Sequence, residues 1–274
     1  LNVQRGGPST GLPTKTEQSD LLQAMYGRNG EAPMPVIASA TPGDCFYAAY
    51  EACRIAVKYM TPVMLLTDGY LANGSEPWQV PQLDELKDFD VSFADESNLT
   101  DGEFMAYTRD KKTLARPWAI PGTEGLEHRI GGIEKEDLTG NVSYDPDNHH
   151  YMVETRAKKV DTVAQDFGPT EIFGDAHGDL LILSWGGTKG SCRSAAEALQ
   201  ADGQKVSHVH LRWVHPFPND LGEILIKFKN VLMPEINYGQ LIKMVRAEFL
   251  IDAKGLNQVR GKPISSSDIQ QAAK

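Results

Sequence analysis

Residues 4–21 read Gln4-Arg5-Gly6-Gly7-Pro8-Ser9-Thr10-Gly11-Leu12-Pro13-Thr14-Lys15-Thr16-Glu17-Gln18-Ser19-Asp20-Leu21. Their glycines and prolines exclude a regular helix or a central strand. The glycines allow a close approach of the backbone to a ligand, and the single arginine offers a planar, permanently charged fork that suits a carboxylate or a phosphate. We therefore predict an anion-binding loop; a surface loop with a solvated arginine is the open alternative.

The second half of this segment has the pattern of a helix start. Thr14 and Glu17 have capping-box spacing, and Leu21, Leu22 and Met25 follow at helical spacing. We expect a helix capped by Thr14, whose free N–H groups would add to the anion site. Such a loop normally follows a strand of an α/β sheet. We therefore expect that the chain begins inside a domain and is truncated at its N-terminus.

Composition narrows the class of protein. The chain has 274 residues, which suffices for about two domains, and its net charge of −10 argues against nucleic acid or an anionic membrane as the main partner. It has no apolar run long enough for a transmembrane helix and no signal peptide at its start. Cys45, Cys53 and Cys192 are far apart in sequence, which predicts reduced core thiols of a cytoplasmic protein.

Strand and helix patterns alternate in two parts of the chain. In the first part, we expect a strand near residues 36–40, a helix with Asp44 as its N-cap, and a buried strand over 62–68. The second part, from Gly174 to Lys274, repeats the alternation and predicts a doubly wound α/β domain. Its strands are expected at 180–185, 206–211, 231–233 and 256–259, and its helices at 191–200, 220–228, 238–249 and 266–273.

The pattern weakens between residues 79 and 169. The acidic segment 84–103 is expected to be a solvated linker, with a docking surface as the alternative. Asp145, Asp147, His149 and His150 match no metal-site spacing, so we expect a polar helix over 149–166 that is capped by Asp147 or Asn148.

The turn Gly186–Gly190 follows a predicted strand. It is neither a dinucleotide fingerprint nor a P-loop, and we expect a tight turn without a ligand. A nucleotide-dependent enzyme of Rossmann type stays open as the alternative.

Several of these segments resemble one family. Residues 4–21 are similar to the signature loop of the alpha subunit of 2-oxoacid:ferredoxin oxidoreductases, the 2-oxoglutarate type especially. The resemblance extends to about residue 265 through four shorter segments: Gly125-Leu126-Glu127-His128, Asp179 to Gly186, His215-Pro216-Phe217-Pro218, and Pro234 to Leu241.

The resemblance implies three parts. Residues 1–95 would be the second half of a thiamine-diphosphate pyrimidine-binding domain, residues 96–177 an irregular linker, and residues 178–274 a domain like the transketolase C-terminal domain. In the family, the motif Tyr-Pro-Ile-Thr-Pro and the glutamate that activates the cofactor lie ahead of the loop, and neither is in this sequence. No catalytic residue is therefore assigned to this chain.

The resemblance also implies a reaction. Such enzymes decarboxylate a 2-oxoacid on thiamine diphosphate, pass electrons through iron–sulfur clusters to ferredoxin, and transfer the acyl group to coenzyme A. The family places thiamine diphosphate, magnesium and a [4Fe–4S] cluster mainly on a beta subunit, so none is expected on this chain alone. Arg5, Thr10 and Thr14 occupy the positions that approach the substrate carboxylate. They do not identify which 2-oxoacid is used, and a non-catalytic docking subunit remains the second alternative.

Overall fold

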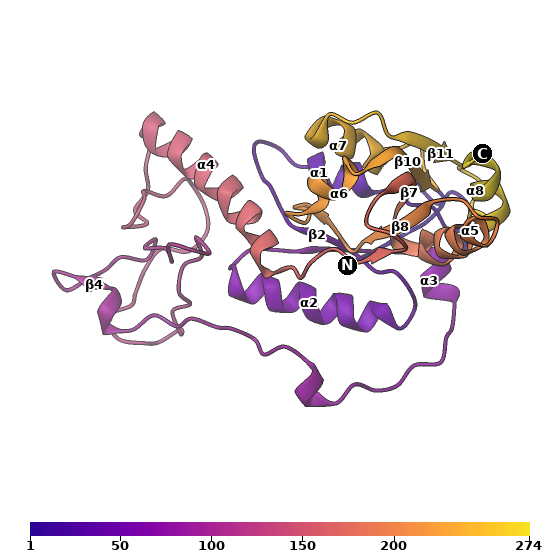
Figure 1. Cartoon of the computed structure of the whole chain (residues 1–274). Helices are drawn as coiled ribbons and strands as arrows, with labels where there is room; N and C mark the ends of the chain where they lie inside the picture. Colours follow the sequence, from indigo (N-terminus) through magenta and orange to yellow (C-terminus); the bar gives the residue numbers. More distant parts are fainter.

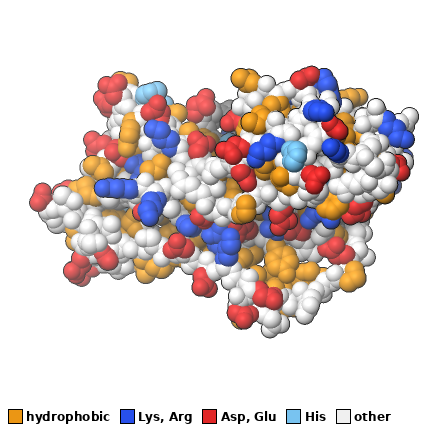
Figure 2. All heavy atoms as spheres, viewed as in Figure 1, with side chains coloured by type: hydrophobic (Ala, Val, Ile, Leu, Met, Phe, Trp, Pro, Cys, Tyr) orange, Lys and Arg blue, Asp and Glu red, His pale blue; other side chains and the backbone are white.

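The computed structural model describes residues 1–274 as two neighbouring β-sheets with an irregular lobe beside them (Figure 1). The fold is mixed α/β, as predicted. Helices pack on both sheets. The lobe, residues 83–166, projects to the left of Figure 1 and of Figure 2, which has the same view, and it carries the hairpin of β4 (Leu99–Thr100) and β5 (Glu103–Phe104) and the helix α4 (Pro146–Thr162). None of the helices combines the length and the apolar character that crossing a bilayer would require.

The first sheet contains four strands in the order β1-β3-β2-β9. Three come from the start of the chain and run parallel, and the fourth comes from the second half and pairs antiparallel to β2. The strands are β1 (Asn2–Gln4), β2 (Val36–Ala38), β3 (Met64–Asp68) and β9 (Trp213–His215). The helices of this part are α1 (Leu21–Tyr26), α2 (Asp44–Lys58) and α3 (Gly69–Asn73).

The second sheet contains five strands in the order β11-β10-β7-β8-β6, and only β6 runs antiparallel to its neighbour. The strands are β6 (Ile172–Phe173), β7 (Gly178–Trp185), β8 (Val206–Leu211), β10 (Phe228–Glu235) and β11 (Lys254–Asn257). Its helices are η4 (Gly186–Thr188), α5 (Lys189–Ala201), α6 (Leu221–Leu225), α7 (Gln240–Phe249) and α8 (Ser266–Ala272).

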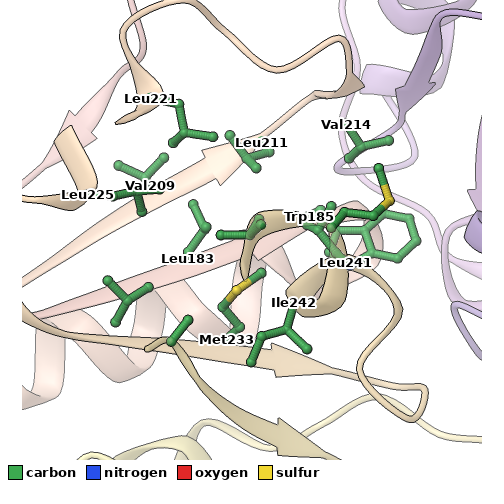
Figure 3. Close-up of a cluster of buried hydrophobic side chains, with 14 of the residues drawn as sticks. Leu183, Trp185, Val209, Leu211, Val214, Leu221, Leu225, Met233, Leu241 and Ile242 are labelled. Carbon is green, nitrogen blue, oxygen red and sulfur yellow. The ribbon is translucent and has the colours of Figure 1, made fainter. Parts of the chain in front are cut away.

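Alternation along β7 separates two faces of the second sheet. Leu181, Leu183 and Trp185 point to the face covered by α6 and α7, where Figure 3 shows Trp185 close to Leu241. Ile182 points to the opposite face and packs in a second cluster with α5 and α8. This alternation has the period expected of a strand that is buried on both sides.

The large core cluster also reaches the first sheet through residues of β2 and β3, and α1 packs in it as well. A third cluster lies on the other face of the first sheet, where α2 contributes small residues and Ile55. Since one core serves both sheets, their strands keep a fixed relation to each other.

The lobe has little regular structure of its own. It contains η1 (Leu83–Glu85), η2 (Glu96–Asn98), β4 (Leu99–Thr100), β5 (Glu103–Phe104), α4 (Pro146–Thr162) and η3 (Val163–Asp166). The lobe is fastened to the C-terminal end of α2: the Trp118 indole donates to the carbonyl of Val57 at 2.9 Å, and Asp166 pairs with Arg54 and Lys58, each at 3.1 Å.

Two predicted helix caps were wrong. Gly43 is the N-cap of α2, and Asp44 is its first helical residue, whose carboxylate accepts from the N–H of Ala40. Asp145, not Asp147 or Asn148, caps α4, because its side chain accepts from the N–H of Asn148 at 2.7 Å. Pro146 then occupies the first helical position, where it needs no N–H partner.

The prediction of core cysteines holds for only one of the three. Cys192 is fully buried under the second sheet, whereas Cys45 is half-buried and Cys53 is exposed on α2. The helical period placed Cys53 beside apolar residues, but its side chain lies on the solvent side of the helix.

Candidate functional site

Residues 5–14, here the loop tip, form a compact exposed turn. Its ends are tied together because the N–H of Gly6 donates to the carbonyl of Lys15 and the N–H of Leu12 donates to that of Gly6, both at 2.9 Å. Arg5 is exposed, and its guanidinium donates once, to the carbonyl of Ser9 at 3.2 Å. Most of the donors of Arg5 therefore remain available to an external anion.

The predicted site residues Arg5, Thr10 and Thr14 all lie on this tip and are all exposed. The backbone conformation of the loop tip depends on Gly11, which has a φ of +51°. A Cβ added at Gly11 would lie 1.9 Å from the carbonyl oxygen of Gly6, so no other residue fits there without opening the turn.

The predicted helix start at Thr14 was wrong. Thr14 has a φ of +61°, in the left-handed region, whereas an N-cap has extended backbone. Helix α1 begins at Leu21, and its N-cap Asp20 makes no side-chain capping bond. The spacing of Thr14 and Glu17 is therefore that of a turn followed by an extended segment.

Residues 15–20, here the loop stem, are that extended segment, and Thr16, Glu17 and Gln18 are buried in it. The Thr16 hydroxyl donates to Asp68 at 2.9 Å, at the carboxyl end of β3. The same carboxylate accepts from the N–H of Gly187 at 3.0 Å, and from two N–H groups of α3 as its N-cap. Asp68 thus joins the stem to η4, the helical turn that follows β7 of the second sheet.

A second buried carboxylate supports the stem from β10. Glu235 accepts from the Trp185 indole, from Asn237 and from the N–H groups of Leu241 and Ile242. Its burial raises the pKa of the Glu235 carboxyl, and these four donors oppose that rise. The carboxylate and α7 together hold Asn237 in place.

Gln18 is the residue of the stem that bonds to the ends of β7 and β10. The Gln18 side chain donates to the carbonyl of Trp185 at 2.7 Å and accepts from the N–H of Ile236 at 3.1 Å. The side chain of Asn237 donates to the backbone carbonyl of Gln18 at 2.8 Å. Gln240 adds a bond to the carbonyl of Ser19 at 2.7 Å. The segment from Glu235 to Gln240, which the sequence offered only as a resemblance, therefore clamps the loop stem.

Glu17 lies directly under the loop tip. It is buried, and burial raises the pKa of its carboxyl, with a further rise from Asp20 and an opposing effect of the Gly7 N–H. A Cβ added at Gly6 would come within 3.4 Å of this carboxylate. The loop tip thus rests on a carboxyl group, with Arg5 facing outward.

The sequence missed Asp68, Gln18 and Glu235. A usable signal was present for two of them, since Asp68 and Glu235 end apolar strands, and polar side chains at the carboxyl ends of parallel strands commonly form sites. Gln18 carried no comparable signal, because its partners lie more than 160 residues away.

The other segments that the sequence analysis named do not bring candidate ligand-binding groups together. His149 contacts Glu134, His150 lies 3.6 Å from Glu154, and no three His, Cys, Asp or Glu side chains of the chain lie together as a metal-binding group. In the turn Gly186–Gly190, the N–H of Gly187 is already taken by Asp68. In the segment Gly125–His128, His128 packs edge-on against Phe104 in the lobe.

Two family models match most of the chain. Residues 1–144 match the thiamine diphosphate-binding domain of pyruvate flavodoxin/ferredoxin oxidoreductases. Residues 178–269 match core domain II of pyruvate:ferredoxin oxidoreductase.

Individual proteins agree with these matches. The chain is 49% identical to the 2-oxoglutarate oxidoreductase subunit KorA of Mycobacterium tuberculosis over 98% of its own length and 40% of that protein. It is 30% identical to the 2-oxoglutarate synthase subunit KorA of Archaeoglobus fulgidus, over 94% of this chain and 65% of that one.

Among solved structures, the 2-oxoglutarate:ferredoxin oxidoreductase of Magnetococcus marinus, with 2-oxoglutarate, coenzyme A and succinyl-CoA bound, superposes with a TM-score of 0.90 at 33% identity. That match covers 99% of this chain and 47% of the other chain. The chain thus spans less than half the length of several proteins that it matches.

Proposed function

We propose a function from one premise: this chain belongs to the pyruvate flavodoxin/ferredoxin oxidoreductase family. On this proposal it is a subunit of the alpha type in a thiamine-diphosphate-dependent 2-oxoacid oxidoreductase that acts on 2-oxoglutarate. The complete enzyme decarboxylates the 2-oxoacid, forms the acyl-CoA and passes the electrons to ferredoxin. The observation that carries the proposal is the exposed Arg5 on a closed loop tip, in a chain 49% identical to a 2-oxoglutarate oxidoreductase subunit.

The proposed role of the loop tip is to bind and orient the substrate carboxylate. Arg5 supplies paired N–H donors, and the hydroxyls of Thr10 and Thr14 complete the hydrogen bonding. A charge-assisted hydrogen bond contributes about 1.5–3 kcal/mol. Because this carboxylate is the group lost as carbon dioxide, its orientation affects the rate as well as the affinity.

The residues of this chain do not fit the iron–sulfur cluster or the magnesium of the reaction. A [4Fe–4S] cluster takes four thiolates, and the three cysteines lie on α2 and α5 with different burial. A Mg²⁺–diphosphate site takes carboxylate or carbonyl oxygens, and the chain has no acidic cluster for it. We therefore assign the cluster, thiamine diphosphate and magnesium to a beta subunit, and derive no step through them.

The test is assembly of the alpha chain with the beta subunit from the same source. We expect a stable complex that reduces ferredoxin only when 2-oxoglutarate and coenzyme A are both present. Arg193→Lys, a surface change on α5 where Arg193 pairs with Glu197, serves as the control and should leave the rate unchanged. A chain that forms no complex, or a complex that prefers pyruvate, would contradict the proposal.

A further inference from the structure

A cavity of about 360 Å³ in the lobe, here the lobe pocket, lies between the segment after β5 and helix α4. Five of its lining residues are cationic: Arg109, Arg116, Lys135, Arg156 and Lys159. The whole chain is strongly acidic, with a net charge of −10. A local concentration of cations in such a chain needs its own explanation.

Few carboxylates balance these cations. Asp137 pairs with Arg109, and Glu134 lies 3.4 Å from Arg156, but Arg116 and Lys159 have no anionic partner. Arg116 donates to the carbonyl of Ala106 at 2.9 Å, and Lys159 donates to that of Met60 at 3.1 Å. Carbonyl groups satisfy hydrogen bonds but leave the positive charges uncompensated.

The guanidinium groups of Arg109 and Arg116 are packed against other side chains of the lobe. The guanidinium of Arg116 lies 4.2 Å from the centroid of the Tyr107 ring, and that of Arg109 lies 5.7 Å from the same centroid. Arg109 also contacts the sulfur of Met152, which is buried. Burial and the nearby Arg116, Arg109 and Arg156 lower the pKa of Lys159 to about 8, which reflects this crowding of like charges.

We propose that the lobe pocket binds the phosphate group of a small phosphorylated molecule, with Arg109, Arg116 and Lys159 as the groups that contact it. A phosphate dianion presents three equivalent oxygens around one centre, which suits cations that surround a single cavity. The volume exceeds what one phosphate fills, and apolar side chains of Met60, Leu114, Ile133 and Met152 line the rest. The remainder of the ligand is therefore compact and partly apolar. No residue of the loop tip takes part, so the proposal is independent of the proposed function.

Two substitutions and one control test the proposal on the full chain. Lys159→Gln and Arg116→Gln remove one cation each and keep a hydrogen-bond donor, whereas Lys158→Gln changes the neighbouring exposed lysine of α4 outside the pocket. Binding of inorganic phosphate, phenyl phosphate and succinate is measured by calorimetry and by thermal melts at constant ionic strength, with chloride as the balancing anion.

We expect both phosphates to raise the melting temperature of the wild type and of Lys158→Gln. The dissociation constant for phenyl phosphate should rise at least about tenfold in Lys159→Gln and Arg116→Gln. Without any phosphate, Lys159→Gln should melt higher than the wild type, because it removes a repelled charge; this second readout also reports that the variant folds. Equal phosphate effects in all four proteins, or no effect beyond that of chloride, would overturn the proposal. Tighter binding of succinate than of either phosphate would assign the pocket to dicarboxylates instead.

Discussion

The loop tip and the loop stem are consecutive in the sequence but differ in exposure, in backbone conformation and in the partners of their hydrogen bonds. The tip is exposed, closes on itself and uses left-handed backbone at Ser9, Gly11 and Thr14. The stem is extended, and its buried residues bond to both sheets: Thr16 donates to Asp68 at the end of β3, and Gln18 bonds to Trp185, Ile236 and Asn237 at the ends of β7 and β10. The difference indicates two roles: the stem stabilises the fold, and the tip presents binding groups in one fixed geometry.

The largest effect is expected where the stem is anchored. Glu235→Ala leaves four buried donors without their acceptor, and each unsatisfied group costs about 1–3 kcal/mol. We expect the free energy of unfolding to fall by at least about 3 kcal/mol in urea titrations. Glu248→Ala, on the exposed side of α7, is the control and should change it little. A loss similar to that of the control would mean that the Glu235 network, which holds Asn237 against the stem, does not supply stability.

The next effect concerns the shape of the tip. Gly11→Ala places a Cβ against the Gly6 carbonyl at a positive φ, so the turn must open. Misplacement of a binding group by about 1 Å can reduce a rate about 100-fold, and we expect kcat/KM of the assembled enzyme to fall by about this factor. Gly7→Ala, whose Cβ would have no atom within 4 Å, should retain most of the activity. If both variants behave alike, the geometry of the tip is not required.

A smaller effect tests Arg5 itself. Arg5→Lys keeps the charge and loses the planar fork, so kcat/KM should fall at least about tenfold, the equivalent of about 1.4 kcal/mol. The melting temperature of the chain should not move, because Arg5 makes one exposed bond to Ser9. Unchanged steady-state kinetics would remove Arg5 from the site.

The smallest effect is expected at Thr14, the last residue of the tip, where it tests whether Thr14 acts in binding or in stability. Thr14→Val removes a hydroxyl and keeps a β-branched side chain, so the backbone strain at φ +61° is unaltered. We expect a loss of a few-fold in kcat/KM, in line with about 0.5–1.5 kcal/mol for one hydrogen bond. The free energy of unfolding should stay within about 0.5 kcal/mol of the wild type, since Thr14 caps no helix. A clear loss of stability in thermal melts would place Thr14 in the stem.

Local patterns predicted most of the doubly wound half. The strand at Leu180–Trp185 and the helix ending at Phe249 were found because their apolar spacing alone determines which side is buried. The same reasoning failed at Thr14–Glu17, where capping-box spacing was present but Thr16 and Gln18 bond to residues far along the chain. Spacing within four residues carries no information about partners that only the tertiary fold brings near.

The candidate site was predicted in part. Arg5, Thr10 and Thr14 do lie on one exposed loop, because glycine and proline punctuate the sequence there. Their supports, Asp68 and Glu235, were missed although both end apolar strands, since a carboxylate there looks the same in sequence whether it only caps a helix or also bonds to a distant segment. The lobe pocket was also missed, because Arg109, Arg116 and Lys135 come from segments without a periodic pattern, and nothing in the sequence places them beside Arg156 and Lys159 of α4.

The pairing of β9 with β2 has a consequence for biosynthesis. Val36 pairs with His215, so the first sheet is completed by a strand that the ribosome makes nearly 180 residues later. Until then β2, whose three residues are all buried in the finished fold, is an unprotected sheet edge. A nascent chain paused between these two points would expose this edge to other chains, and we expect chaperones to engage it there.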